Sequence, residues 1–190
     1  MHGLSLTIAV FVFALFVCAI PVSFKRERVP ARMKALSLGA CITFAAYIWA
    51  ALHSSGSPQS DAAGSLIHLS AGCLFLSAIR LAGNAKLPIA FSQSAPANLI
   101  DIGPYKRVRH PLYSSYSLYW LGCVIQTGSA TVGIGAALLI ATYVILASAE
   151  EKTLLSGDLQ FEYLAYRNRT GWFWPKNLIK APSSGTGQSV

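Results

Sequence analysis

The chain has 190 residues, of which 54% are hydrophobic and 12% are charged, and its formal net charge at pH 7 is +8. Soluble domains carry about 25% charged residues, so the composition excludes an ordinary soluble domain, while the length allows one domain. The 15 Lys and Arg residues form three clusters beside long uncharged stretches, which favours anionic lipid head groups and a charged small molecule as partners over nucleic acid. The clusters are Lys25, Arg26, Arg28, Arg32 and Lys34; Arg80, Lys86, Lys106, Arg107 and Arg109; and Lys152, Arg167, Arg169, Lys176 and Lys180.

Five apolar stretches predict an all-α integral membrane protein, because a helix of about 20 apolar residues crosses the hydrocarbon core of a bilayer. The first stretch lacks a cationic start and is followed by Lys25-Arg26-Glu27-Arg28, so we interpret it as a membrane span and not as a cleavable signal peptide. We expect one membrane domain over residues 1–180 and a disordered polar tail over residues 181–190. The expected spans are residues 4–24, 36–53, 65–83, 111–126 and 130–149.

The connections between the spans differ in length and composition. Thr127-Gly128-Ser129 is a tight uncharged turn, which predicts a helical hairpin of the fourth and fifth spans. Pro111 suits the first helical position of the fourth span, and Gly133 and Gly135 favour close helix packing in the fifth. Residues 84–101 form the longest polar connection, and the sequence leaves open whether they act as a lid.

The segment after the fifth span predicts a cytoplasmic amphipathic helix. Its large side chains recur at spacings of four, four and three residues, as on one face of a helix, at Leu155, Leu159, Tyr163 and Tyr166. Gly171 is expected to end this helix. The aromatic run that follows, Trp172-Phe173-Trp174-Pro175, is typical of an anchor at the membrane interface.

The positions of the basic clusters predict the orientation of the chain in the membrane. All three fall on the same side of the expected spans, so the N-terminus is expected outside and the C-terminus in the cytoplasm. The tight turn makes the start of the fourth span and the end of the fifth neighbours at the cytoplasmic face. We therefore expect Arg109 and His110 to lie opposite Glu150 and Glu151.

S-adenosylmethionine is a ligand that needs both signs of charge together with aromatic walls. Its carboxylate suits Arg or His, its ammonium suits a carboxylate, and its sulfonium suits aromatic faces. The alternative, judged from the residues alone, is a set of snorkelling interface side chains without a ligand. The four cysteines lie in apolar stretches without metal-ligand spacing, and His68 is expected to be a hydrogen-bonded structural residue, so no metal site is expected.

A longer motif resembles the isoprenylcysteine carboxyl methyltransferase family, and the related phospholipid N-methyltransferases share much of it. The motif consists of Gly103-x-Tyr105-x-x-x-Arg109-His110-Pro111-x-Tyr113, Glu150-Glu151-x-x-Leu154, Tyr163-x-x-Tyr166 and Pro175. The resemblance covers roughly residues 100–175. This chain departs from the family pattern between Leu155 and Phe161, where residues are inserted or shifted, so the register of the two following tyrosines is less secure.

The resemblance implies a cytoplasm-facing pocket for S-adenosylmethionine, formed by the last two spans and the C-terminal segment. The residues that it implies for cofactor binding are Tyr105, Arg109, His110, Pro111, Tyr113, Glu150, Glu151, Tyr163 and Tyr166. The residues expected to act on the acceptor or in catalysis are Arg167, Arg169 and Glu151.

These expectations point to an S-adenosylmethionine-dependent methyltransferase with a lipophilic acceptor, as in carboxyl methylation of an isoprenylcysteine-like substrate. Methyl transfer to a phospholipid amine or to a small amine or thiol is an alternative within the same chemistry. Membrane sterol and enone reductases resemble the same C-terminal arrangement, but their NADPH carries phosphates and would favour more basic residues than the acidic pair allows. A membrane scaffold without activity would leave the acidic pair beside Arg109 and His110 unexplained.

Overall fold

The computed structural model describes residues 2–23, 31–53, 56–84 and 99–176 of the chain. These residues form six α-helices and one short 3-10 helix, with no strand among them, which confirms the predicted all-α class. The helices are α1 (His2–Ser23), α2 (Ala31–His53), α3 (Pro58–Asn84), η1 (Gly103–Lys106), α4 (Pro111–Thr127), α5 (Ala130–Leu155) and α6 (Gln160–Arg169). The expected tail, most of the long connection and the first three basic positions lie outside the described residues.

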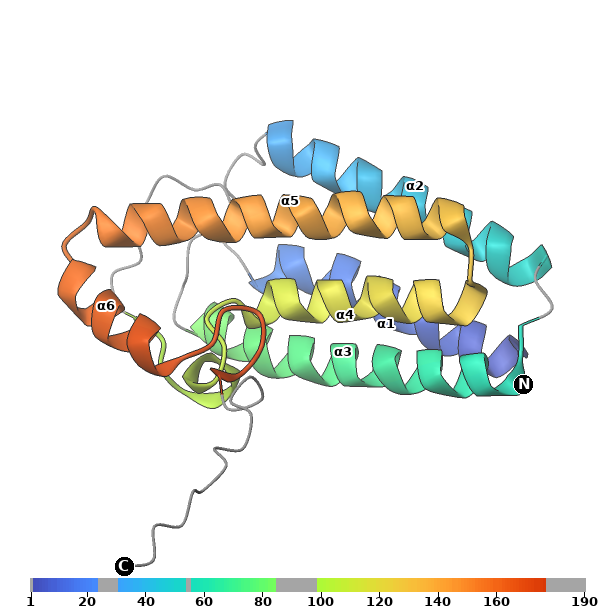
Figure 1. Cartoon of the computed structure of the whole chain (residues 1–190), viewed down its shortest axis with the longest axis horizontal. Coiled ribbons are helices and arrows are strands. Elements are labelled where there is room, and N and C mark those ends of the chain that lie inside the picture. Colours follow the sequence, from blue (N-terminus) through green and yellow to red (C-terminus); the bar gives the residue numbers. More distant parts are fainter. Residues whose placement is uncertain (1, 24–30, 54–55, 85–98, 177–190) are drawn as a thin grey trace, which may run out of the picture.

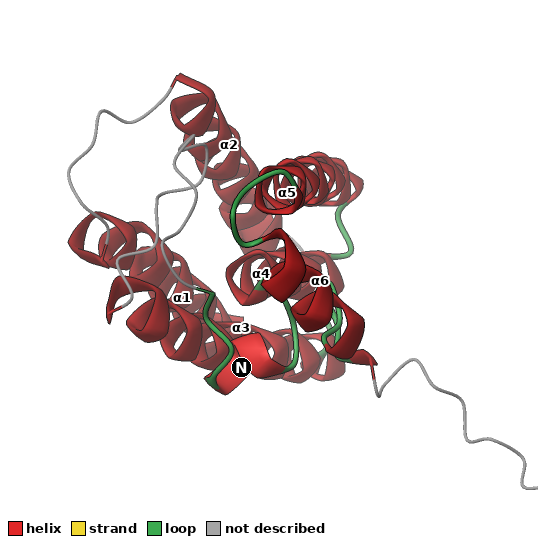
Figure 2. Cartoon of the chain, turned by 90° about the vertical axis from the view of Figure 1, so that its left-hand side faces the viewer, coloured by secondary structure: helices red, strands yellow, loops and turns green. Residues whose placement is uncertain are grey.

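The five long helices form a bundle whose successive members alternate in direction (Figure 1). One end of the bundle carries the first residues of α1, α3 and α5 and the last residues of α2 and α4. The opposite end carries η1, the start of α4, the end of α5 and the short helix α6, which packs across that end (Figures 1 and 2). Two segments that are distant in sequence therefore meet at one end of the bundle.

Among the residues that the structure describes, three helices are long and apolar enough to cross a membrane: Ala31–His53, Pro58–Ala82 and Ala130–Leu155. The apolar part of α1, Gly3–Ala19, is shorter. Helix α4 has 17 residues, at the lower end of the usual range of about 17–25, and buries several polar side chains. The composition and these helices make the chain an integral membrane protein.

Three helices extend beyond the apolar stretches that predict them. Helix α2 begins at Ala31, α3 begins at Pro58 and α5 continues to Leu155. At the start of α3, the Ser60 N–H donates to Ser57 Oγ over 3.1 Å, which caps a polar first turn that hydropathy does not register. Helix ends depend on capping and backbone geometry, whereas apolar length reports only the part of a helix that lies in lipid.

The amphipathic helix expected across Leu155 to Tyr166 is wrong in one respect, because the chain breaks between α5 and α6. Leu155 is the last residue of α5, and the Ser156 N–H bonds back to the Lys152 carbonyl over 3.1 Å. Helix α6 starts at Gln160. Four non-helical residues intervene, as expected for a segment of Ser, Gly and Asp that competes with helical hydrogen bonding.

The hairpin of α4 and α5 is confirmed. Gly128 caps α4 at a φ of 61°, in the left-handed region that favours glycine, and its N–H bonds to the Val124 carbonyl over 2.8 Å. Pro111 lies in the first turn of α4, as predicted. In α5, a Cβ on Gly135 would lie 2.7 Å from the Thr43 side chain of α2, so this glycine permits close helix contact. Gly133 has open space around it, so the packing role expected for it is wrong.

Helix α4 occupies the centre of the bundle and packs most extensively against α3. Its Tyr119 hydroxyl donates to the Ala9 carbonyl of α1 over 3.1 Å. His68 is fully buried, and its Nε2 lies 3.5 Å from Cys123 Sγ, in agreement with a structural role. Cys123 is buried, whereas the other three cysteines lie on the exposed surface of the bundle and form no disulfide.

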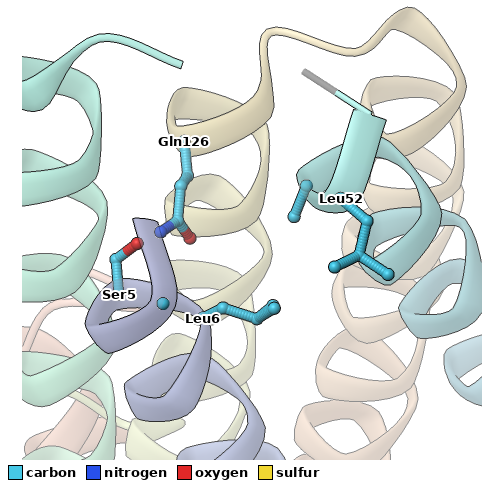
Figure 3. Close-up of a pocket in the computed structure, with 6 residues that line it drawn as sticks. Ser5, Leu6, Leu52 and Gln126 are labelled. Atoms are coloured by element: carbon cyan, nitrogen blue, oxygen red, sulfur yellow. The ribbon is translucent and has the colours of Figure 1, made fainter. Parts of the chain in front are cut away.

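A small cavity of about 150 Å³ opens at the end of the bundle that carries the first residues of α1. Figure 3 shows Gln126 extending from α4 toward Ser5 of α1, with Leu6 and Leu52 close by. The Gln126 side-chain oxygen accepts a hydrogen bond from the Tyr47 hydroxyl over 2.6 Å. The residues that line this cavity are Gly3, Ser5, Leu6, Ala51, Leu52 and Gln126. Because none of these side chains is ionisable, the cavity offers no charge to a charged ligand.

Candidate active site

The candidate site lies at the opposite end of the bundle, where the start of α4 meets the end of α5. Arg109 Nε donates to Glu151 Oε1 over 2.7 Å, and the two side chains are only 8% and 11% exposed. Arg109 Nη1 also donates to the carbonyls of Thr170, at 2.9 Å, and Arg167, at 3.4 Å. A single guanidinium therefore joins α5 to the end of α6 through its Nε and Nη1 groups.

His110 and Tyr113 complete a network around the acidic pair. His110 Nε2 lies 3.1 Å from Glu151 Oε1, and its Nδ1 lies 3.6 Å from Glu150 Oε2. The Tyr113 hydroxyl donates to Glu150 Oε1 over 2.5 Å. We name Arg109, His110, Tyr113, Glu150 and Glu151 the charged cluster. The structure thus brings together two sets of residues whose contacting members are 37 to 42 positions apart in the sequence.

A short segment, residues 170–174, runs beside the charged cluster, and we name it the strap. It forms an isolated parallel bridge between Val108 and Gly171, in which the Gly171 N–H donates to the Arg107 carbonyl over 3.0 Å and the Arg109 N–H donates to the Gly171 carbonyl over 2.9 Å. The Ser114 hydroxyl of α4 donates to the Phe173 carbonyl over 2.8 Å. The strap fixes the backbone from which Arg109 and His110 project.

The strap changes the interpretation of the aromatic run as a membrane anchor. Trp172 and Phe173 are partly buried against the core, and the Phe173 ring lies 6.1 Å from the His110 ring. Trp174 is 47% exposed, so it alone of the three has the exposure of an interfacial anchor. A Cβ on Gly171 would lie 1.7 Å from the Trp174 carbonyl oxygen, so the strap requires glycine at this position. No pattern of side chains in the sequence predicts this backbone pairing.

A buried layer between η1 and α6 contains the other three tyrosines implied for cofactor binding, which are Tyr105, Tyr163 and Tyr166. The Tyr166 hydroxyl donates to the Tyr105 carbonyl over 2.6 Å, and Tyr163 and Tyr166 are 1% and 2% exposed. Burial, with nearby carboxylates and phenols as smaller causes, raises the pKa of the Tyr105, Tyr163 and Tyr166 phenols above the usual value. They are therefore neutral hydroxyl groups at physiological pH, and the bond from Tyr166 to Tyr105 joins α6 to η1.

The two arginines at the end of α6 point to different places. Arg167 Nε lies 3.9 Å from Glu151 Oε2, and its side chain is 48% exposed. Arg169 instead forms an ion pair with Asp101, and its guanidinium carbon lies 5.8 Å from the centre of the Tyr166 ring. The structure therefore brings Arg167 to the site and holds Arg169 outside it.

A cavity of about 410 Å³ lies against the charged cluster. This volume falls within the range of roughly 300–1,000 Å³ that is usual for small-molecule sites. Its lining residues are Arg109, Ser148, Glu151, Lys152, Leu155, Arg167 and Trp172. The α5 residues among them are spaced by three, four and seven positions from Ser148, so they share one helix face. No group of three or more His, Cys, Asp or Glu side chains that could hold a metal occurs in the described part of the chain.

The sequence model of the phospholipid methyltransferase family matches residues 61–158. This match spans more than half of the chain. The chain belongs to the phospholipid methyltransferase family. It is thus a membrane methyltransferase that acts on lipid. No significant match was found among curated proteins or among solved structures.

The matched residues cover nearly all of α3, all of η1, α4 and α5, and both halves of the charged cluster. Helices α1 and α2 and the α6–strap segment lie outside the match. In this methyltransferase, Arg109 and Glu151 of the implied cofactor residues line the cavity, whereas Tyr105, Pro111, Tyr163 and Tyr166 are buried and do not line it. Arg167, which is expected to act on the acceptor, also lines the cavity. The implied cofactor residues thus divide into a lining group and a supporting group.

Sequence reasoning missed four lining residues of the methyltransferase, Ser148, Lys152, Leu155 and Trp172. Three of them follow from helical periodicity once α5 is continued past the end of the apolar stretch, because Ser148 and Leu155 lie three and four residues from Glu151, and Lys152 lies four residues from Ser148. Trp172 could not be found this way. Its position depends on the strap, which is held by backbone hydrogen bonds.

Proposed function

We propose that this protein transfers the methyl group of S-adenosylmethionine to a lipophilic acceptor at the cavity beside the charged cluster. The observation that carries the proposal is the pairing of Arg109 with Glu151 at the wall of a cavity of about 410 Å³. This cavity lies at the end of the bundle where the start of α4 meets the end of α5. Buried ionic groups at such a depth are costly and mark functional sites.

The residues at the cavity fit the polar groups of S-adenosylmethionine. Glu151 Oε1 accepts a hydrogen bond from Arg109 and lies 3.1 Å from His110 Nε2, while Oε2 lies 3.9 Å from Arg167 Nε. We propose that Oε2 accepts from the ammonium of the cofactor. Trp172 offers an aromatic wall, and Leu155 offers an apolar one. We propose that Arg109 and His110, which the sequence assigns to the cofactor's carboxylate, act by orienting Glu151. Their proposed role is therefore positioning.

When bound, the cofactor supplies an electrophilic methyl group on a sulfonium. The contribution of the protein is to align the acceptor atom with that methyl group, which can account for about 7–11 kcal/mol of the barrier in a near-attack geometry. A carboxylate acceptor attacks with an oxygen lone pair and needs no base. Arg167 is placed to hold such an acceptor, because its side chain lines the cavity and is half exposed.

The acceptor that we propose first is an isoprenylcysteine-like carboxylate, which the motif from Gly103 to Tyr113 and the acidic pair supports by resemblance. The family match supports a second candidate, the amine of a phospholipid. Both have long apolar chains. Burial of these chains at a site beside the lipid contributes about 0.8 kcal/mol of binding free energy per CH₂. The match to a methyltransferase family does not favour the NADPH-dependent reductase alternative.

We further propose that the candidate site faces the cytoplasm. The described basic residues lie at the start of α2, near the end of α3, in and after η1, near the end of α5 and in and after α6, all at one end of the bundle (Figure 1). By the positive-inside rule this end is cytoplasmic, with the N-terminus outside.

The test of the proposed function is methyl transfer by the purified protein in detergent. The protein is incubated with methyl-labelled S-adenosylmethionine and, in separate reactions, S-farnesylcysteine, phosphatidylethanolamine and a total lipid extract. We expect label in the organic phase of at least one reaction, with its loss in Glu151→Gln. Absence of labelled lipid in all three reactions, from protein shown to be folded, would overturn the proposal.

A further inference from the structure

The cavity beside the charged cluster has more positive than negative charge on its walls. Its ionisable lining residues are the cations Arg109, Lys152 and Arg167 and the single carboxylate Glu151. One oxygen of that carboxylate already accepts from Arg109 and lies within hydrogen-bonding distance of His110. The Arg109–Glu151 pair is therefore internally neutralised, and the positive charge that remains at the cavity belongs to Lys152 and Arg167.

The two remaining cations come from different elements and face the same space. Lys152 follows Glu151 on α5, is exposed, and has no ion pair with any described residue. Arg167 lies near the end of α6, where its carbonyl accepts hydrogen bonds from Lys176 Nζ, at 2.9 Å, and Arg109 Nη1, at 3.4 Å. These bonds hold the backbone of Arg167 in place, while its side chain stays 48% exposed at the cavity.

We infer that Lys152 and Arg167 form an anion-binding edge of this cavity, which takes a carboxylate or phosphate group of one of the two reactants. This inference rests on the proposed function. A planar guanidinium can donate two hydrogen bonds to an oxyanion, and an ammonium adds a point charge from another element of the lining. The anion is either the carboxylate of the methyl donor or the acidic group of the lipid acceptor, and Glu151 in the same lining receives the donor's ammonium.

The assignment gives Lys152 a role that differs from that of a snorkelling side chain. A snorkelling lysine interacts with bulk head groups, and its replacement changes neither cofactor affinity nor acceptor KM. A lysine at an anion-binding edge contributes a charge-assisted hydrogen bond to one defined reactant. Loss of such a bond weakens binding of that reactant by about tenfold or more.

The test compares Lys152→Gln, Arg167→Gln and the matched control Lys34→Gln, which removes an exposed lysine at the start of α2 that does not line the cavity. Two quantities are measured for each variant: the Kd of S-adenosylhomocysteine by titration calorimetry, and the KM of whichever acceptor the wild type methylates. A rise in Kd in both cavity variants assigns the anion to the methyl donor. A rise in acceptor KM with unchanged Kd assigns it to the lipid. In either case Lys152→Arg restores most of the loss and Lys34→Gln behaves as wild type.

Wild-type Kd and KM in both cavity variants would overturn the inference. If the wild type neither binds S-adenosylhomocysteine nor transfers a methyl group, the proposed function fails, and the anion-binding edge is tested separately. Native mass spectrometry in an uncharged detergent then compares retention of phosphatidylglycerol with that of diacylglycerol. Preferential retention of the anionic lipid, reduced in Lys152→Gln and Arg167→Gln, supports the edge. Equal retention by wild type and variants contradicts it.

Discussion

Arg109 connects the two halves of the candidate site, because its guanidinium binds a carboxylate of α5 and a carbonyl of the strap at the same time. An ammonium at this position could reach one of these partners but not both. The buried carboxylate of Glu151 also depends on this pair, since an uncompensated buried charge costs several kcal/mol. Arg109 is therefore expected to affect both stability and cofactor affinity.

We predict that Arg109→Ala lowers the free energy of unfolding by about 3–5 kcal/mol, the usual cost of breaking a buried ion pair from one side. Arg109→Lys should recover part of the stability but not the cofactor affinity. Arg107→Ala is the control, because Arg107 is two positions away and its side chain is exposed. Thermal unfolding in detergent measures the effect, and an Arg109→Ala variant as stable as Arg107→Ala would refute it.

The buried phenols predict how stability changes in alkali. Because burial raises the pKa of the Tyr166 phenol in the folded state, the unfolded state loses its proton first, near its ordinary pKa of about 10. This phenol therefore contributes no pH dependence between pH 7 and 9 and destabilises the fold as the pH rises above about 10.

Tyr166→Phe tests this behaviour. The variant should lose about 1 kcal/mol at pH 7, because the Tyr105 carbonyl loses its hydrogen bond. The difference between variant and wild type should then shrink as the pH rises past 10. Thermal unfolding from pH 7 to 11 gives the comparison. A constant difference over this range would show that folding does not raise the pKa of this phenol.

Among the elements, the long helices were predictable and the strap was not. The apolar stretches predicted α1 to α5 because lipid requires long runs of apolar side chains, and Thr127-Gly128-Ser129 predicted the hairpin through its turn chemistry. The start of α3 at Pro58 was missed because a polar capped turn leaves no trace in hydropathy. The strap was missed because backbone hydrogen bonds between Arg107, Arg109 and Gly171 place it, and these carry no sequence signal.

The strap gives a prediction with a matched control on another element. Gly171→Ala should destabilise the protein and disrupt the charged cluster, because its Cβ would lie 1.7 Å from the Trp174 carbonyl oxygen. Gly133→Ala in α5, where a Cβ meets nothing within 4 Å, should be neutral or stabilising by roughly 0.5–1 kcal/mol. Thermal unfolding of both variants measures this contrast. Equal effects would mean that the strap does not hold the site.

On the scale of the whole molecule, the alternation of helix directions gathers the described basic residues at one end of the bundle (Figure 1). We predict that this end is cytoplasmic. A fluorescent protein that folds only in the cytoplasm should be fluorescent when fused to the C-terminus and dark when fused to the N-terminus. The reverse pattern would place the candidate site on the outer face and would contradict the proposed orientation.

The account depends on the cavity beside Glu151 being the site of the methyl donor, and the affinity for S-adenosylhomocysteine tests this most directly. Titration calorimetry should show binding to the wild type and a loss of about tenfold or more in Glu151→Gln, which removes the charge opposite the ligand's ammonium. Glu162→Gln, which alters an exposed carboxylate of α6, should keep wild-type affinity, and thermal unfolding should show that both variants are folded. Equal affinity in wild type and Glu151→Gln, or no binding to the wild type, would contradict the account.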